Sequence, residues 1–535
     1  MNIALLTRNC GLTLAFVCAL FSTAVLAKNT NINDSPATCT RESGPAGITA
    51  ARWSNPEQAQ AALTKPGFGK IGFMTQDGKP LVAHIYLPSH FDSANGPVWF
   101  VMHGIKRNAD YYAENAAAVA ERYQALTVVI EFSQRYYPAS EDYTLGITSS
   151  GRAGLRAERE GRYLKPDAFL YNEVERVFEA VRQTLRGNQR GYYLFGHSAG
   201  AQFTHRMLTF VPCARVLGAI AANAGWYTLP IEDDRKKFDM PYSLKGSPAE
   251  SYNLKALLSA PLTLLLGTQD IKGPDEDRNV RNKPATMAQG VNRLARGHHY
   301  FETGQSLARS LGVPFAWKLV LAPGAEHDVQ QVIASAGYLM FASPKEPVCV
   351  SSIVEEAGKI VFNEVLLQPP NGGDGDANHD GIFHPKQEQF VEIVNAGKMP
   401  VCLAGWTLEG KEKKTKHVFP LGKALAPGKA WVVLNGGIPT GDFGESMVQR
   451  STNGLPLDPK GDILTLRDAK GRVAKQFSWG DCGGMTCSTD HWRGDLWMTG
   501  SSLSRWPDID GPWRLHHEVT KVPMSPGFKN TGERW

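Results

Sequence analysis

The sequence lacks several features that would assign it to a class at once. Beyond residue 27 it has no run of about 18 continuous apolar residues, the length typical of a membrane-spanning helix. It also lacks a low-complexity tract, and its 42% hydrophobic and 20% charged residues are typical of folded domains. The formal net charge of +5 is spread along 535 residues, and the absence of a basic stripe gives no indication of a nucleic-acid partner. We therefore expect folded domains and no integral membrane segment once the N-terminus is removed.

The N-terminus has the pattern of a signal peptide. Arg8 precedes an apolar run at 11–27, and Val25 and Ala27 occupy the −3 and −1 positions of a cut before Lys28. An uncleaved membrane anchor is the alternative, although the run is short for a membrane span. We predict a signal peptide at 1–27, an N-terminal extension at 28–64, and a secreted or periplasmic protein.

Few cysteines remain after signal removal, and an even number in an exported chain indicates disulfides. Only Cys482 and Cys487 can be paired from the sequence, because CGGMTC is a short loop with glycines that can fold back on itself. A zinc site built on this pair is the alternative, but no second pair with metal-ligand spacing accompanies it. The other four are Cys39, Cys213, Cys349 and Cys402.

The first half of the chain alternates strand and helix patterns. Hairpin-like strands at 69–76 and 80–88 precede continuous apolar runs typical of strands buried on both faces of a sheet. This order predicts a doubly wound, mostly parallel α/β sheet, which we assign to 65–345. The expected later strands are 97–104, 126–132, 191–196, 216–222, 262–267 and 315–323, and the expected helices are 109–124, 169–185, 201–208 and 329–341.

The second half changes to short strand-like runs separated by Gly, Pro, Asn and Asp. The close spacing of these runs predicts an all-β sandwich or barrel, which we assign to 346–535. The runs are 359–367, 389–395, 405–410, 429–435, 462–468 and 473–479.

A G-x-S-x-G pentad at 196–200 is the main chemical signal. It follows the expected strand 191–196 and opens a helix, the setting in which small glycines let a serine occupy a sharp, strained turn. A hydroxyl there is positioned as a nucleophile. We therefore predict Ser198 as the nucleophile of a serine hydrolase.

A serine nucleophile needs a base and a carboxylate that orients the base. In this setting they follow in the order Ser, acid, His at later strand ends. Asp270 and His327 fit, because each lies just past an expected strand. Asp275 and Asp277 in the same loop are alternative acids. His298 and His299 have no expected strand end beside them, and His197 is expected to pack rather than act as the base.

Two backbone N–H groups should bind the oxyanion. Ala199 follows the nucleophile at a helix N-terminus, and Ile105 lies in the loop after the third expected strand of this fold. His103 opens that loop, and we expect it to shape the loop and to border the substrate pocket.

The stretches HGIKRNADYY, GHSAGAQF, GTQD and PGAEHD together resemble the secreted α/β-hydrolases grouped around poly(3-hydroxybutyrate) depolymerases and feruloyl esterases. The resemblance implies hydrolysis of carboxylic esters through an acyl-enzyme, with Ser198, Asp270 and His327 as the triad and no catalytic cofactor. Trp226 is a candidate for the substrate pocket, with a core position as the alternative.

The stretches IVFNEV, FVEIVNAG, LAGWTLEG and GDILTLRDAKG resemble the lamin-tail domain, an immunoglobulin-like β-sandwich appended to exported bacterial enzymes. The resemblance implies no catalytic role for this domain. A surface, a glycan or a protein is its expected ligand, and its many tryptophans are candidates for contacting a polymer.

The second half also contains a D-x-N-x-D-G motif, typical of calcium loops. Asp376, Asn378 and Asp380 place oxygen side chains at alternate positions, followed by Gly381. The pattern departs from a calcium loop at the twelfth position, where an acid is expected. Gln387 stands there, and the acid Glu388 comes one residue later. Asp376, Asn378 and Asp380 are candidate ligands of a structural calcium ion, with a plain Asp/Asn/Gly turn as the alternative.

The sequence as a whole predicts an exported serine hydrolase of the carboxylic-ester class. A binding protein on a hydrolase scaffold, a serine peptidase and an acyltransferase remain alternatives, because a peptidase and an acyltransferase share the first chemical step.

Overall fold

The computed structural model describes residues 44–45, 47–147, 162–231, 239–249, 251–349, 359–494 and 500–535. The predicted signal peptide, 1–27, lies outside these residues. Within them, no helix is both long and apolar enough to cross a membrane.

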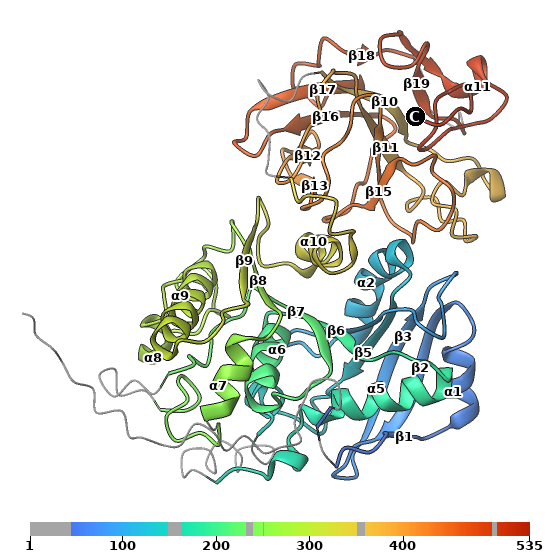
Figure 1. Ribbon diagram of the computed structural model, residues 1–535. Helices are drawn as coiled ribbons and strands as arrows, with labels where there is room; N and C mark the ends of the chain where they lie inside the picture. The colour runs from blue at the N-terminus through green and yellow to red at the C-terminus, as the bar shows by residue number, and fades with distance from the viewer. Residues whose placement is uncertain are drawn as a thin grey trace, which may run out of the picture. The chain divides into compact units, whose positions relative to one another are not determined.

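A nine-stranded sheet forms the first domain (Figure 1), in the order β1-β2-β3-β5-β4-β6-β7-β8-β9. The pairs among β1, β2, β3 and β5 are antiparallel, and all pairs from β5 to β9 are parallel. The predicted mostly parallel α/β fold is therefore confirmed. The strands are β1 (Arg52–Trp53), β2 (Gly67–Met74), β3 (Pro80–Leu87), β4 (Val98–Met102), β5 (Leu126–Glu131), β6 (Tyr192–His197), β7 (Val216–Ala222), β8 (Leu262–Gly267) and β9 (Lys318–Ala322).

Helices pack on both faces of this sheet. Buried apolar residues of α2 and α10 belong to one cluster, and those of α5 and α6 to another. The sheet also takes in β1, and the helix α1 packs beside it, although the sequence assigned both to an N-terminal extension. The helices are α1 (Pro56–Ala62), α2 (Ala109–Tyr123), α3 (Ser140–Thr144), η1 (Pro166–Ala168), α5 (Asn172–Leu185), α6 (Ala199–Phe210), α7 (Ser251–Leu258), α8 (Pro284–Met287), α9 (Arg293–Leu311) and α10 (Val329–Phe341).

The second domain consists of two sheets, in the orders β15-β14-β11-β10-β19-β20 and β13-β12-β16-β17-β18. A shared apolar cluster joins them and contains Trp406, Trp431 and Trp479, which are at most 1% exposed. The strands are β10 (Ile360–Leu366), β11 (Phe390–Asn395), β12 (Thr407–Glu409), β13 (Thr415–Val418), β14 (Ala430–Leu434), β15 (Met447–Arg450), β16 (Gly461–Arg467), β17 (Val473–Gly480), β18 (His491–Trp492), β19 (Leu503–Arg505) and β20 (Trp513–Leu515), with η2 (Gly373–Gly375) and α11 (His516–Val519).

The tryptophans of the second domain mostly form its core. Among those described, Trp506 is the most exposed, at 37%. The predicted all-β fold is confirmed, and burial explains its richness in aromatic residues.

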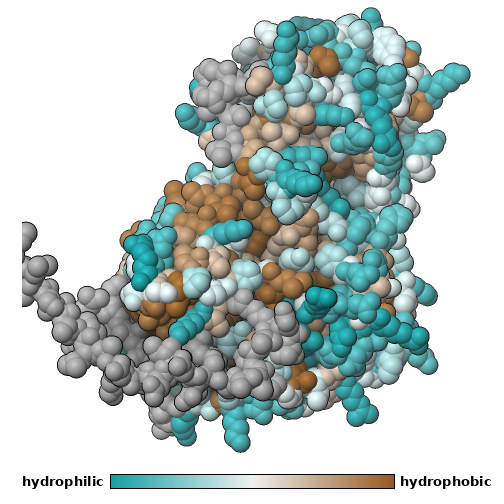
Figure 2. All heavy atoms as spheres, viewed as in Figure 1, coloured by the Kyte–Doolittle hydropathy of each residue, from teal (hydrophilic) through white to brown (hydrophobic). Residues whose placement is uncertain are grey.

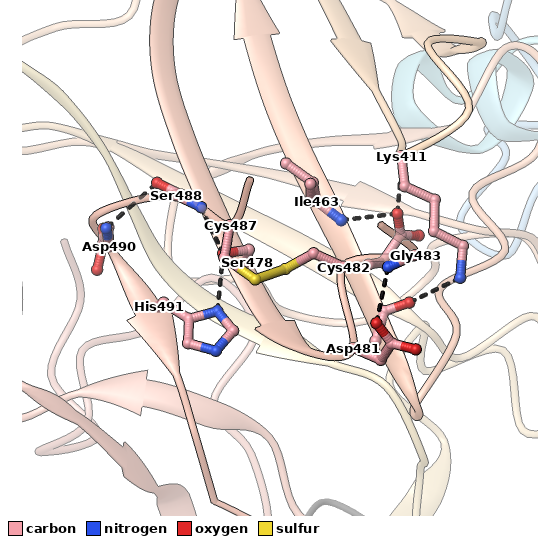
Figure 3. The surroundings of a disulfide bond; sticks show 12 residues. Lys411, Ile463, Ser478, Asp481, Cys482, Gly483, Cys487, Ser488, Asp490 and His491 are labelled. Carbon is pink, nitrogen blue, oxygen red and sulfur yellow. Dashed lines mark hydrogen bonds between the residues drawn. A yellow bond between two sulfur atoms is a disulfide. The ribbon is translucent and has the colours of Figure 1, made fainter. Parts of the chain in front are cut away.

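The disulfide predicted between Cys482 and Cys487 is present (Figure 3). A second one joins Cys349 to Cys402. In the described part of the chain, Cys482, Cys487 and His491 are the only three His, Cys, Asp or Glu side chains spaced to hold a metal. Both sulfurs are bonded to each other, and zinc binding needs thiolates, so the disulfide replaces the alternative zinc site.

Candidate active site

Ser198 lies between β6 and α6 in a strained conformation. Its φ of 58° and ψ of −115° are rare for a residue with a side chain. A Cβ on Gly196 would lie 2.2 Å from the carbonyl oxygen of Gly200, and one on Gly200 would lie 2.0 Å from the carbonyl oxygen of Met102. The turn therefore requires glycine at both ends of the pentad, as the strand-turn-helix interpretation expects.

The structure brings Ser198, His327 and Asp270 together. The distance from His327 Nε2 to Ser198 Oγ is 3.0 Å, and that from His327 Nδ1 to Asp270 Oδ2 is 2.7 Å. With a proton on Nδ1, the imidazole donates to the carboxylate and accepts from the serine hydroxyl. Asp270 is 2% exposed, so this carboxylate depends on protein donors rather than on water.

The alternative acids lie elsewhere. Asp277 Oδ2 accepts a hydrogen bond from Arg293 Nη2 at 2.8 Å, and Asp275 is exposed to solvent. His298 and His299 lie within α9 rather than at a strand end. Of the candidate acids, only Asp270 contacts His327 within the described ranges.

The two expected oxyanion donors are free to bind a ligand. Ala199 is the first residue of α6, and Ile105 lies in the loop after β4 and is 50% exposed. In the described ranges, neither backbone N–H donates a hydrogen bond to the protein. Their role in binding an oxyanion stays a prediction.

His103 has no exposed surface to offer a substrate, so its predicted place at the pocket stays a prediction without support from its burial. The residue is fully buried; its Nδ1 lies 3.1 Å from the carbonyl oxygen of Gly104, and its Nε2 accepts from the N–H of Phe132 at 3.2 Å. Burial lowers its pKa to about 3. The neutral ring fixes the start of the loop that carries Ile105, as the loop-shaping interpretation expects.

Trp226 offers little surface to a substrate. It is 4% exposed, and its ring lies 4.2 Å from the guanidinium carbon of Arg206 and 5.0 Å from that of Arg281. These contacts favour the core alternative, with cation–π packing on the ring.

His197 packs, as the sequence predicts, and the structure adds that it packs against the base. The ring of His197 lies 4.8 Å from the ring of His327, and its Nδ1 lies 3.1 Å from the hydroxyl oxygen of Tyr112. Burial lowers the pKa of His197 well below its usual range. The neutral His197 therefore packs against the base without competing for its proton.

Buried neutral histidines should make the fold sensitive to acid. The pKa values of His103 and His417 are lowered to about 3 by burial. The unfolded chain binds a proton near pH 6.5 and the folded chain only near 3, so the free energy of unfolding should fall as pH drops below about 6.5.

Thermal unfolding between pH 7.5 and 4 measures this effect. His417→Phe should lessen the acid-induced drop in Tm, whereas a variant at the exposed residue His90, His90→Asn, should follow the wild type. Equal drops in the His417→Phe variant and the wild type would contradict the assignment.

The D-x-N-x-D-G motif forms a tight loop in the second domain. Asp376 Oδ2 accepts from the N–H of Gly381 at 2.9 Å, and Asn378 Oδ1 accepts from the N–H of Asp380 at 2.9 Å. Asp376 Oδ1 is buried without a hydrogen-bond partner among the described residues. Glu388 is fully buried and binds Asn378 Nδ2 through Oε2 at 2.7 Å. Calcium at Asp376, Asn378 and Asp380 stays a prediction.

Calcium should stabilise the protein if this prediction holds. At millimolar Ca²⁺ we expect a higher Tm, because an ion that binds only the folded state stabilises it. Asp376→Ala should lose the increase, and Asp374→Ala, at an exposed neighbour, should keep it. An identical Tm with Ca²⁺ and with chelator would contradict the prediction.

The parallel sheet, the strained serine and the strand-end positions of its partners define the first domain as an α/β-hydrolase fold. No curated protein matches the chain. Residues 354–481 match the family described as Lamin Tail Domain.

Two solved structures are similar to the first domain. One is poly(aspartic acid) hydrolase-1 from Sphingomonas sp. KT-1, with 35% identity, 52% of this chain and 100% of that chain covered, and a TM-score of 0.47. The other is LpqC, a poly(3-hydroxybutyrate) depolymerase from Bordetella parapertussis, with 33% identity and a TM-score of 0.48. The match covers 54% of this chain and 94% of that chain. Because the matches reach 33–35% identity and span at least 94% of each relative, the protein belongs to their family of α/β-hydrolases. It carries a lamin tail domain in addition.

Proposed function

We propose that the protein is an exported serine hydrolase that cleaves carboxylic esters through an acyl-enzyme on Ser198. The observation that carries this proposal is the chain of contacts from Ser198 Oγ through His327 to Asp270, at 3.0 and 2.7 Å. These distances suit proton transfer from the hydroxyl to the imidazole.

In the first half of the reaction, Ser198 Oγ attacks the ester carbonyl carbon and His327 Nε2 takes the hydroxyl proton. Asp270 stabilises the imidazolium that forms. The tetrahedral intermediate collapses as His327 gives the proton to the leaving alcohol, which leaves an acyl group on Ser198. Water then attacks the acyl-enzyme by the same proton route and releases the acid.

The N–H groups of Ala199 and Ile105 would stabilise the negative oxygen of both intermediates. Their support is that each N–H lacks a protein acceptor in the described ranges, and that Ala199 begins a helix, whose N-terminus favours negative charge. The chemistry proposed here uses no metal or cofactor.

A polymeric substrate and an extracellular or periplasmic location complete the proposal. The names of both similar proteins refer to polymers, poly(aspartic acid) and poly(3-hydroxybutyrate). The disulfides Cys349–Cys402 and Cys482–Cys487 support an oxidising compartment. We assign the lamin tail domain the role of binding a surface, a glycan or a protein.

Product analysis tests the substrate class. Purified protein is incubated with short acyl p-nitrophenyl esters, an aliphatic polyester, a feruloylated glycan and poly(aspartic acid), with and without an added alcohol acceptor. We expect release of acids from esters. Cleavage of poly(aspartic acid) alone would indicate a peptidase-type enzyme. Transfer of the acyl group to the added alcohol would indicate an acyltransferase, and no product from any substrate would indicate a binding protein.

A further inference from the structure

The carboxylate of Asp270 has a second partner. While Oδ2 accepts from His327, Oδ1 accepts from Arg293 Nη1 at 3.1 Å. Both Asp270 and Arg293 are nearly buried, with 2% and 3% of their surfaces exposed. A buried carboxylate oxygen needs a donor, and here a cation supplies it.

Arg293 is itself held in place by a second carboxylate. Its Nη2 donates to Asp277 Oδ2 at 2.8 Å, and Asp277 Oδ1 accepts from the N–H of Asn279 at 2.9 Å. Burial alone would raise the pKa of Asp277, but hydrogen bonds from Asn279 and Arg293 hold it below its usual range. The ionised Asp277 therefore fixes the far side of the guanidinium and offsets part of its charge.

The start of α9 is tied to the loop that carries Asp270. Asn292, the N-cap, donates through Nδ2 to the carbonyl oxygen of Ile271 at 3.0 Å, and the N–H of Leu294 donates to the carbonyl oxygen of Asp270 at 3.4 Å. The Asn292 side chain also accepts, through Oδ1, from the N–H of Ala295 at 2.9 Å. The residues on both sides of Arg293 are thus anchored to the loop that carries Asp270.

We propose that Arg293 is a positioning residue for Asp270, the acid of the triad. Asp277 holds Arg293 in place and partly neutralises its charge, and the two together set the basicity of His327. The proposal rests on the proposed function. The guanidinium fixes Asp270 with Oδ2 toward the imidazole, and its positive charge weakens the stabilisation of the imidazolium by Asp270. The negative charge of Asp277 reduces that effect of the guanidinium.

Removing the positive charge of Arg293 and removing the negative charge of Asp277 should therefore shift the pH dependence of the reaction in opposite directions. Arg293→Gln removes the cation, so the imidazolium becomes easier to form and the acidic limb of the kcat/KM pH profile should move up by about half to one pH unit. Asp277→Asn removes the anion and should move the limb down. The other charged or titratable groups that face His327 are His197 and Asp328, and Glu326 and Lys106 lie near Asp328. All four are unchanged in both variants.

Loss of positioning should appear in kcat rather than in KM. For Arg293→Gln we expect kcat to fall roughly 10- to 100-fold at the optimum pH with KM nearly unchanged, because orientation of the reacting groups is lost and substrate binding is not. Arg293→Lys keeps the charge and should recover part of kcat and the wild-type limb. Arg309→Gln removes an exposed charge from the last turn of the same helix and should match the wild type.

The experiment combines these pH profiles with a titration of His327 in full-length protein labelled with ¹³C-histidine, assigned by its loss in His327→Gln. The NMR midpoint is read whether or not esters are cleaved. We expect the His327 titration midpoint to rise in Arg293→Gln and to fall in Asp277→Asn. If the midpoints shift in this way but the wild type cleaves no ester, only the proposed function is rejected. Ester cleavage with midpoints that stay fixed or move the same way in both variants would overturn the role of Arg293.

Discussion

Ser198→Ala should reduce ester hydrolysis by at least about 10⁴-fold, because it removes the only oxygen that can carry the acyl group while the rest of the site stays in place. The turn itself should persist, since the substitution removes only the hydroxyl from a residue that keeps its Cβ. The rate of p-nitrophenyl ester hydrolysis measures the effect, with Tm as the check on folding.

A serine at the exposed end of α9 provides the matched control. Ser310→Ala should hydrolyse the same esters as fast as the wild type. If Ser198→Ala matched the wild type as well, the hydrolysis would come from another group and the proposed acyl-enzyme would be rejected.

Asp270→Asn should lower kcat by roughly 10³- to 10⁴-fold, because an amide favours the wrong tautomer of His327 and cannot stabilise the imidazolium. Asp277→Asn should lower it by less than about 10-fold, since Asp277 contacts the arginine and not the histidine. The pair therefore distinguishes two of the three carboxylates that the sequence alone left open.

The comparison depends on kcat values measured at each variant's own optimum pH. Circular dichroism and Tm confirm that both variants are folded. Equal losses in the two variants, or a larger loss in Asp277→Asn, would mean that the acid has been assigned to the wrong residue.

The sheet and the triad could be predicted because their signals are local. Continuous apolar runs such as 97–104 and 262–267 identify strands buried on both faces, and parallel strands place their following loops at one edge of the sheet. Ser198 lies in the pentad that follows such a run, and Asp270 and His327 each lie within a few residues of the end of an expected strand. Strands of two to four residues, such as β13 and β18, carry too short a pattern to be predicted.

The surroundings of the triad could not be predicted, because they depend on contacts between distant segments. Arg293 follows no strand and belongs to no motif, and only the folded chain brings it to Asp270. His103 was assigned to the substrate pocket from its place beside the oxyanion loop. The sequence could not reveal that its ring points into the core and accepts from the N–H of Phe132.

The central claim is that Ser198 is an activated nucleophile, and covalent labelling tests it most directly. Folded protein is treated with a fluorophosphonate, and intact mass and peptide mapping locate the adduct. We predict one adduct on Ser198 in the wild type, much slower labelling in His327→Ala, and none in Ser198→Ala. A wild-type protein that stays unlabelled, or an adduct that persists in Ser198→Ala, would contradict the assignment.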